Sequence, residues 1–179
     1  QYTCALLSNG NITCWGYNAY GQTNVPASVQ GNAIEVSAGS VHTCALLKNQ
    51  SITCWGDNAY GQLTVPEDVQ GKSIKVSTGY YHTCALLDNG NITCWGYGPM
   101  IGNYVWGDAV GLSAKVNHNC ALLSNGNITC WGGSNTYGEL DVPNLVQGNA
   151  IKVSAGGEHT CALLNNGNVT CWGDNTNGQ

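Results

Sequence analysis

The 179-residue sequence contains no phenylalanine, no arginine, a single methionine and only five lysines. Charged side chains make up 8% of the chain, and the formal net charge is −5. Nucleic-acid binding requires a basic face that follows the phosphate backbone, and so few cations provide none. The composition therefore excludes nucleic acid from the expected partners. Surface solubility must come from Asn, Ser, Thr and Gly, and from any attached glycans.

Long apolar runs and helical periodicity are also missing. No stretch of 18 apolar residues occurs, so no segment is expected to span a membrane. No window holds the 3.6-residue apolar period of an amphipathic helix, and glycine and asparagine interrupt every segment. No signal peptide is present and the chain begins with Gln1, which indicates a processed or cropped end.

Motifs for catalysis are absent as well. The chain has no nucleophile motif, no phosphate-binding glycine loop, and no calcium-loop pattern among its ten scattered carboxylates. We therefore expect no enzyme activity and no cofactor.

What the sequence does contain is a repeat. Two cysteines ten residues apart occur five times, and a Trp-Gly pair follows the second cysteine each time. This pattern predicts one repeat array without a linker or a second domain. The units lie near residues 1–40, 41–80, 81–117, 118–157 and 158–179.

Short strands separated by turn residues make up each unit. Strands are expected over Ser73–Ser77, His82–Leu87 and Ile92–Trp95. A weaker edge strand is expected near Val65, just before Pro66, because proline is tolerated at a sheet edge. Four antiparallel strands in about 40 residues match the blade of a β-propeller. We expect an all-β, propeller-like array of four-stranded antiparallel blades, of which the chain covers about four and a half.

The cysteine spacing fits a tight hairpin. If Cys4 and Cys14 face each other, the loop is Ser8–Gly10, whose last position favours glycine because it needs a positive φ. Directly opposed residues lie about 4.5–5.5 Å apart, which suits a disulfide. Gln50 replaces this glycine in the second unit, so its turn is expected to be the most strained.

All ten cysteines follow this scheme, and disulfides imply an oxidising compartment. Metal binding is the alternative, because His42, His82 and His159 each precede a cysteine by two residues. The C-x₂₋₄-C knuckle of zinc sites is absent, so the histidines are interpreted as strand residues near a blade edge. The expected disulfides are Cys4–Cys14, Cys44–Cys54, Cys84–Cys94, Cys120–Cys130 and Cys161–Cys171.

An N-glycosylation sequon accompanies every hairpin tip. The alternative explanation is composition, because Asn and Thr are common in turns and strands. The second unit argues against it, since Ser51 replaces the usual acceptor and a sequon reappears two residues earlier. Covalent N-glycans place the protein outside the cell, secreted or at the cell surface. The expected acceptors are Asn11, Asn49, Asn91, Asn127 and Asn168.

The stretch HTCALLDNGNITCWG at residues 82–96, together with DNAYGQL at residues 57–63, resembles the repeat of the regulator of chromosome condensation family. The resemblance covers nearly the whole chain. The residues that follow the pattern are Gly79, His82, Ala85, Leu86, Gly90, Trp95 and Gly96, with Asn58, Gly61, Gln62 and Leu63 in its second half.

The resemblance implies a β-propeller, commonly seven-bladed. The short repeat is similar to secreted bacterial propellers of the family, which include a β-lactamase inhibitor. Paired cysteines, sequons and the lack of basic residues differ from the nuclear members. These differences argue against the nuclear exchange-factor activity.

The strand pattern leaves the ring incomplete. The strands around the two cysteines each occur five times, whereas the Ile-Lys-Val strand occurs four times. The array begins in mid-blade, and Gln179 is in phase with Gln22. Exposed strand edges are usually covered, so the expected partners are adjoining repeats of the same chain or a second copy.

The third unit departs from the others. Val116 follows Trp95 at the distance that separates Val76 from Trp55, which aligns the two valines and places a shortened loop after Val116. The usual Asn-x-Tyr-Gly-Gln and Val-Pro segments give way to aromatic and apolar residues. Local drift with core packing is one interpretation, and an interface is the other. The interface residues would be Met100, Ile101, Tyr104 and Trp106.

Three functions from different classes remain open. A non-enzymatic structural glycoprotein module of a surface or fibrillar assembly is favoured, because near-identical repeats suit units that pack alike. A secreted recognition propeller, either a carbohydrate-binding lectin or a protein inhibitor, is the alternative. A binding protein with one target is expected to have more diverse loops. An enzyme is the third class and the least favoured, because no catalytic motif is present.

Overall fold

The computed structural model of the chain describes residues 1–98, 102–105, 107–133 and 135–179, with only the backbone of 102–105. Five antiparallel β-sheets follow one another along the chain. The first two sheets contain β1 (Tyr2–Leu6) and β2 (Ile12–Gly16), then β3 (Ala33–Ala38), β4 (His42–Leu47) and β5 (Ile52–Gly56). The third contains β6 (Ser73–Thr78), β7 (His82–Leu87), β8 (Ile92–Gly96) and β9 (Gly102–Val105). The last two contain β10 (Ala109–Lys115), β11 (His118–Leu123) and β12 (Ile128–Gly132), then β13 (Ala150–Ala155), β14 (His159–Leu164) and β15 (Val169–Gly173).

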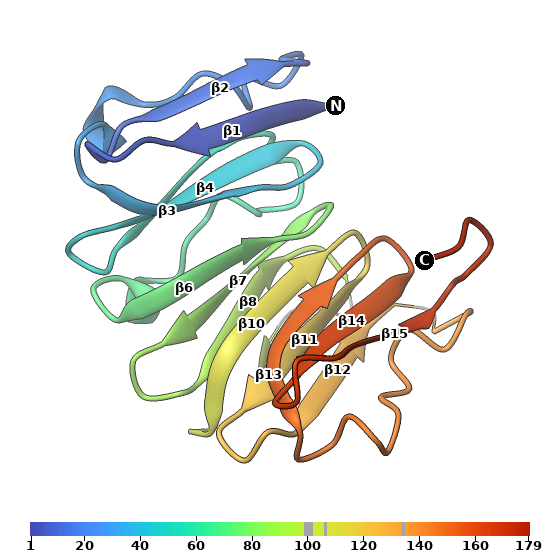
Figure 1. Cartoon of the computed structure of the whole chain (residues 1–179). Coiled ribbons are helices and arrows are strands. Elements are labelled where there is room, and N and C mark those ends of the chain that lie inside the picture. Colours follow the sequence, from blue (N-terminus) through green and yellow to red (C-terminus); the bar gives the residue numbers. More distant parts are fainter. Residues whose placement is uncertain (99–101, 106, 134) are drawn as a thin grey trace.

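The sheets follow each other around an open arc, with β1 and β2 at one end and β13 to β15 at the other (Figure 1). The first strands of the later sheets, β3, β6, β10 and β13, contact one another in a continuous row. Two 3-10 helices, η1 (Ala27–Val29) and η2 (Glu67–Val69), lie in connections between sheets. In the described part of the chain, no helix has the length and apolar character needed to cross a membrane.

The hydrophobic core is divided among the interfaces between neighbouring sheets. Each of four clusters of buried residues joins two successive sheets. Between the second and third sheets, for example, Leu46 packs in one cluster with Val76 and Trp95. Because each blade buries its apolar side chains against its neighbours, stability comes mainly from blade-to-blade contacts.

The three strands predicted in and beside the second unit are confirmed, since β6, β7 and β8 begin at the predicted residues. The four-stranded blade is wrong as a rule. Three of the sheets have three strands, and no strand forms near Val65 in the described segment 57–72.

A glutamine side chain explains the missing fourth strand. Gln70 Oε1 accepts a hydrogen bond from the Ile52 N–H at 2.9 Å, and Gln70 Nε2 donates to the Ile52 carbonyl at 2.9 Å. One amide group thus satisfies both backbone groups of Ile52 at the outer edge of β5, where another strand would pair. We call this the glutamine cap. It recurs where Gln30 binds Ile12 and Gln147 binds Ile128.

The third unit lacks the capping glutamine, and there a fourth strand does form. Strand β9 pairs with β8, and Val105 lies opposite Ile92. Ile92 is the counterpart of Ile52, so the strand takes the place of the glutamine cap.

The predicted alignment of Val116 with Val76 is wrong. Leu112 pairs with Ala121 just as Val76 pairs with Ala85, so Leu112 takes the position of Val76. The residues that this unit lacks therefore precede β10 instead of following it, and the turn after β10 has the ordinary length.

That turn contains an unusual backbone conformation. Val116 adopts a φ of 22°, which is unfavourable for a β-branched residue.

The hairpin turns follow the prediction. Gly10 has a φ of 80°, and its N–H donates to the Leu7 carbonyl at 2.9 Å. A Cβ on Gly10 would lie 2.9 Å from the carbonyl carbon of Gly31, so the turn also lacks space for a side chain. Gln50 adopts a φ of 63° at the same position, which confirms the predicted strain in the second unit.

Candidate docking site between blades

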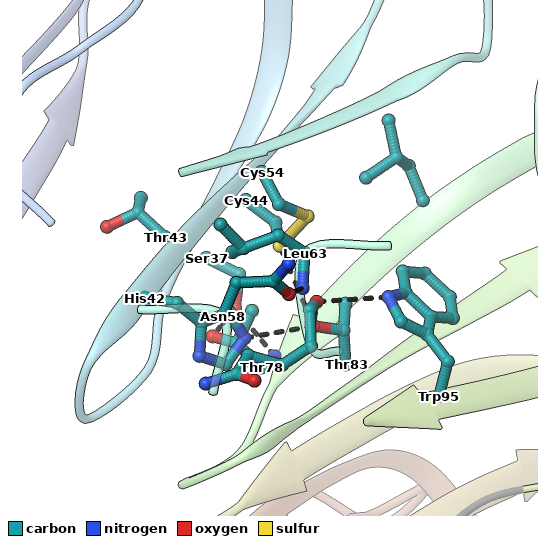
Figure 2. Close-up of a disulfide and its surroundings, with 12 residues drawn as sticks. Ser37, His42, Thr43, Cys44, Cys54, Asn58, Leu63, Thr78, Thr83 and Trp95 are labelled. Carbon is teal, nitrogen blue, oxygen red and sulfur yellow. Dashed lines mark hydrogen bonds between the residues drawn. A yellow bond between two sulfur atoms is a disulfide. The ribbon is translucent and has the colours of Figure 1, made fainter. Parts of the chain in front are cut away.

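Five disulfides join the cysteine pairs that the constant spacing predicts. The two cysteines of a pair lie directly opposite each other, as Cys44 on β4 and Cys54 on β5 illustrate (Figure 2). Cys44 is fully buried and belongs to the core between the second and third sheets. The disulfides therefore crosslink the middle of each hairpin, and all except Cys161–Cys171 belong to the core clusters between blades.

Near this disulfide, a backbone carbonyl of a connecting loop binds two side chains of the next blade. The Gln62 carbonyl accepts hydrogen bonds from Thr83 Oγ1 at 2.9 Å and from Trp95 Nε1 at 3.0 Å (Figure 2). Thr83 and Trp95 pair across β7 and β8, and both are buried. We call this arrangement the carbonyl clamp, because the third hairpin holds the loop that leaves the second blade.

The carbonyl clamp recurs between the first and second blades and between the fourth and fifth. In both places a threonine hydroxyl and an indole N–H donate to one loop carbonyl at 2.8 to 3.0 Å. The acceptors and their donors are Gln22 with Thr43 and Trp55, and Glu139 with Thr160 and Trp172.

The loop itself positions the clamp carbonyl. Gln62 Oε1 accepts a hydrogen bond from the Tyr60 N–H at 2.9 Å, and Gln62 Nε2 donates to Asp57 Oδ2 at 2.8 Å. Asn58 Oδ1 accepts from the Leu63 N–H at 2.9 Å. The Asn-x-Tyr-Gly-Gln sequence therefore folds onto itself and presents its carbonyl to the next hairpin.

A row of buried histidines adds a second link between blades. His42 Nε2 lies 2.9 Å from Thr83 Oγ1, whose own proton goes to the Gln62 carbonyl. The imidazole must therefore donate from Nε2, which leaves Nδ1 unprotonated. His82 bonds in the same way to Asn119 Oδ1 at 2.8 Å. His118 bonds to Thr160 in the same row. In the first blade Tyr2 takes the position of the histidine, and its hydroxyl bonds to Thr43.

Burial governs the charge of these histidines. It lowers the pKa of His42 to about 4, and neighbouring His82 adds to the decrease. Burial also lowers the pKa of His82 and of His118. The Nδ1 atoms of all three are buried without a hydrogen-bond partner. At neutral pH the row is uncharged.

The histidines occupy a different place from the one predicted. His42, His82 and His159 start the middle strands of their blades, whereas the sequence suggested a position near a blade edge. His42 and His82 are buried, and His159 is half-buried. His82 packs so closely on Gly79 that a Cβ there would overlap its imidazole ring. Sequence reasoning overlooked His118, although it too precedes a cysteine, Cys120, by two residues.

Serine side chains connect the first strands of neighbouring blades. Ser37 Oγ accepts from the Thr78 N–H at 3.0 Å and lies 2.9 Å from Thr78 Oγ1 (Figure 2). Ser77 Oγ accepts from the Ala114 N–H at 2.8 Å. Sequence reasoning missed these links too. Each serine accepts a hydrogen bond from a backbone N–H group that has no partner in its own sheet.

The sequon asparagines gather at the hairpin tips, at the strand ends opposite the histidines. Asn49 and Asn168 are exposed, whereas the other three are half-buried. Asn91 Oδ1 accepts a hydrogen bond from the Gly107 N–H at 2.7 Å. The three half-buried acceptors are Asn11, Asn91 and Asn127.

The predicted interface of the third unit falls largely outside the described residues. Met100, Ile101 and Trp106 lie outside them, and Tyr104 belongs to β9. Among the residues that are described, no group of three or more His, Cys, Asp or Glu side chains could hold a metal ion.

An open array of antiparallel blades, linked by carbonyl clamps and histidine contacts, defines a β-propeller repeat protein. The sequence model of the regulator of chromosome condensation (RCC1) repeat matches residues 1–22, 33–62, 74–99, 109–139 and 150–179. The chain belongs to this repeat family.

Solved structures share the fold. The CRINKLY WD40 ectodomain of the Arabidopsis thaliana receptor kinase ACR4 superposes with a TM-score of 0.81 at 31% identity, over 97% of this chain and 67% of that one. The ectodomain of the Physcomitrella patens receptor kinase CR4 gives 0.81 at 25% identity, over 96% and 49%. Prp20p from Saccharomyces cerevisiae gives 0.74 at 19% identity, over 96% and 56%. The chain thus spans about half to two thirds of these structures, and comparison with the curated proteins finds no match.

Proposed function

We propose that this chain is a non-enzymatic extracellular structural module, a building block that extends an assembly by docking like repeats. The observation that carries the proposal is the carbonyl clamp. It joins the first blade to the second, the second to the third and the fourth to the fifth by the same contacts, so it provides a way to add a further repeat at either end. The added repeat belongs either to the same polypeptide or to a neighbouring copy.

Both end blades present the groups that dock repeats inside the array. Trp15 is 54% exposed, whereas Trp55, its counterpart in the next blade, is 6% exposed and bound in a carbonyl clamp. At the other end, Gln179 Oε1 accepts from the Asn177 N–H at 2.9 Å, as Gln62 Oε1 does from Tyr60. The final loop therefore has the fold that presents a clamp carbonyl.

Three observations support an extracellular location. Five disulfides suit an oxidising compartment. A sequon occurs at every hairpin tip, and two of the similar structures are receptor-kinase ectodomains. Glycans on the tips would cover one face of an assembly while its ends stayed free to dock.

Sedimentation of the 179-residue chain, produced in an oxidising host, tests the proposal. We expect association that grows with concentration. Trp15→Ala should weaken it by about tenfold or more, because the association would bury Trp15 as an aromatic anchor. Tyr17→Ala is the matched control, since Tyr17 is 51% exposed nearby and forms no part of a clamp. A compact monomer at all concentrations, or equal association of the Trp15 variant, would contradict it.

A further inference from the structure

Four tyrosine rings form a contiguous cluster where the second and third blades meet. Tyr60 lies in the loop after β5, Tyr80 and Tyr81 lie between β6 and β7, and Tyr97 follows β8. The Tyr60 ring centroid lies 4.7 Å from those of Tyr81 and Tyr97. The Tyr80 and Tyr81 centroids lie 4.3 Å apart. We call these four residues the tyrosine cluster.

The tyrosine cluster faces solvent. Tyr60 is 45% exposed, Tyr80 is 38% exposed and Tyr97 is 51% exposed. Aromatic side chains contribute large apolar areas, and neighbouring rings that stay exposed together indicate a place where something binds.

The cluster lies on the face away from the sequons. The Tyr97 N–H donates to the Tyr81 carbonyl at 3.0 Å, just beyond the last pair of β7 and β8. The hairpin tip begins at Leu87, at the other end of the same strands. Glycans on the tips would therefore leave the tyrosine cluster open.

Folding does not explain these tyrosines, because the second blade provides an internal comparison. Tyr80–Tyr81 correspond there to Ser40–Val41, and Tyr97 corresponds to Asp57. The Asp57 N–H donates to the Val41 carbonyl at 3.0 Å, the same bond that Tyr97 makes. The backbone thus forms without the aromatic rings, so the rings serve another purpose.

Hydrogen bonds fix the backbone from which the rings project. The Tyr60 N–H is bound to Gln62 Oε1, and the Tyr80 N–H donates to the Val116 carbonyl at 3.1 Å. The Tyr97 N–H is bound to the Tyr81 carbonyl. Such preorganisation lowers the entropic cost of binding a ligand.

We propose that the tyrosine cluster binds an uncharged oligosaccharide built of hexopyranose units. A pyranose ring carries C–H groups that pack on the negative face of an aromatic ring, and hydroxyls that bond with phenol oxygens. The hydrogen bond with Tyr80 raises the pKa of Tyr81, which favours its neutral phenol. This site does not rest on the assembly role, which uses none of these side chains.

Two other kinds of ligand fit less well. The first is a protein partner. From the usual size of an aromatic side chain, the three most exposed rings offer roughly 300 Å² of surface, whereas a stable protein interface buries about 800 Å² on each partner. A quaternary ammonium group needs an open cage of aromatic rings. Rings whose centroids lie 4.3 to 4.7 Å apart leave no such opening, so the ligand must lie on top of them.

Calorimetric titration of the 179-residue chain with neutral hexasaccharides tests the proposal. The probes are cellohexaose, mannohexaose and chitohexaose, with choline and hexagalacturonate as a cationic and an acidic comparison. The variant Tyr80→Ser/Tyr81→Val/Tyr97→Asp introduces the residues of the second blade, so it is designed to keep the fold. Tyr137→Ala is the matched control, because Tyr137 is 49% exposed outside the cluster.

We expect at least one neutral hexasaccharide to bind. The triple variant should lose about tenfold or more in affinity while keeping its thermal midpoint, and the Tyr137 variant should bind as the parent does. The proposal is overturned if none of the neutral sugars binds, if only choline or the acidic sugar binds, or if the triple variant binds equally well.

Discussion

Trp95 of the third blade donates its indole N–H to the backbone carbonyl of Gln62, 33 residues earlier in the loop that leaves the second blade. The bond is 3.0 Å long, and the indole is buried. A loop that connects two blades is thereby fixed by a side chain of the blade it leads to. The same contact links the first blade to the second and the fourth to the fifth, so at these junctions one blade depends on the next.

Thr83→Val tests the carbonyl clamp without a change in side-chain volume. The substitution leaves both the Gln62 carbonyl and His42 Nε2 short of a partner in a buried site. We expect the free energy of unfolding to fall by about 2–3 kcal/mol. The matched control is Thr3→Val, at the exposed counterpart in the first blade, where urea unfolding should detect little change.

Gln70→Ala tests the glutamine cap. It removes the hydrogen bonds that Gln70 makes to the Ile52 N–H and carbonyl, and we expect the free energy of unfolding in urea to fall by about 1–3 kcal/mol. Thr64→Ala, an exposed change in the same connection, should cost far less. Equal stability of the two variants would show that water replaces the cap.

Gln50→Gly should stabilise the protein. The residue holds a φ of 63°, which costs a residue with a Cβ about 1–2 kcal/mol but suits glycine. We expect a gain of about 1 kcal/mol in the free energy of unfolding, after the added flexibility of the unfolded chain. The reverse change, Gly90→Gln, should destabilise more, because its Cβ would lie 2.7 Å from the Gly107 carbonyl. A higher unfolding midpoint for Gly90→Gln would refute this account of the turns.

Acid should destabilise the blades through the histidine row. Burial lowers the pKa of His42 to about 4, whereas the unfolded chain titrates near 6.5. The unfolded state thus binds the proton first, so stability is full above pH 6.5 and falls as the pH drops toward 4. His42 alone accounts for a loss of about 2 kcal/mol at pH 5, and His82 and His118 act in the same direction.

Glu35 acts in the opposite direction. Burial raises its pKa, so the folded state takes up this proton more readily than the unfolded chain and gains stability as the pH falls. Glu35→Gln removes that contribution. In urea unfolding, the free energy of unfolding of this variant should therefore fall more between pH 7 and pH 5 than that of the parent protein. Constant stability of this variant between the two values would rule out the histidine row as a pH-sensitive element.

Glycan occupancy should follow exposure. Asn49 and Asn168 are exposed, whereas Asn91 is half-buried and bonded to the Gly107 N–H. We expect the highest occupancy at Asn49 and Asn168, measured by peptide mass spectrometry of protein from its native source. Enzymatic deglycosylation that changes no mass would disprove glycosylation at the tips.

Local signals in the sequence predicted the hairpins well. Cys84, Cys94 and Gly90 all lie within one short hairpin, where chain geometry leaves few choices. The repeat length then indicated the blades, since each unit needs a neighbour to bury its apolar face.

Contacts across blades could not be read from the sequence in the same way. Gln70 caps a strand 18 residues earlier, and His42 bonds a threonine 41 residues later. No local pattern distinguishes a glutamine that replaces a strand from one that lies in a loop. The absence of that glutamine in the third unit was visible, but its consequence depended on tertiary pairing.

Light scattering and surface labelling of the native protein test the central claim most directly. Intact cells are treated with a membrane-impermeant biotin reagent, and the mass of the recovered protein is measured under non-denaturing conditions. We predict labelled, glycosylated protein in assemblies larger than a single polypeptide, or in one polypeptide with further clamped repeats. Unlabelled protein recovered from inside the cell, as a monomer with no more blades than the five described here, would contradict the account.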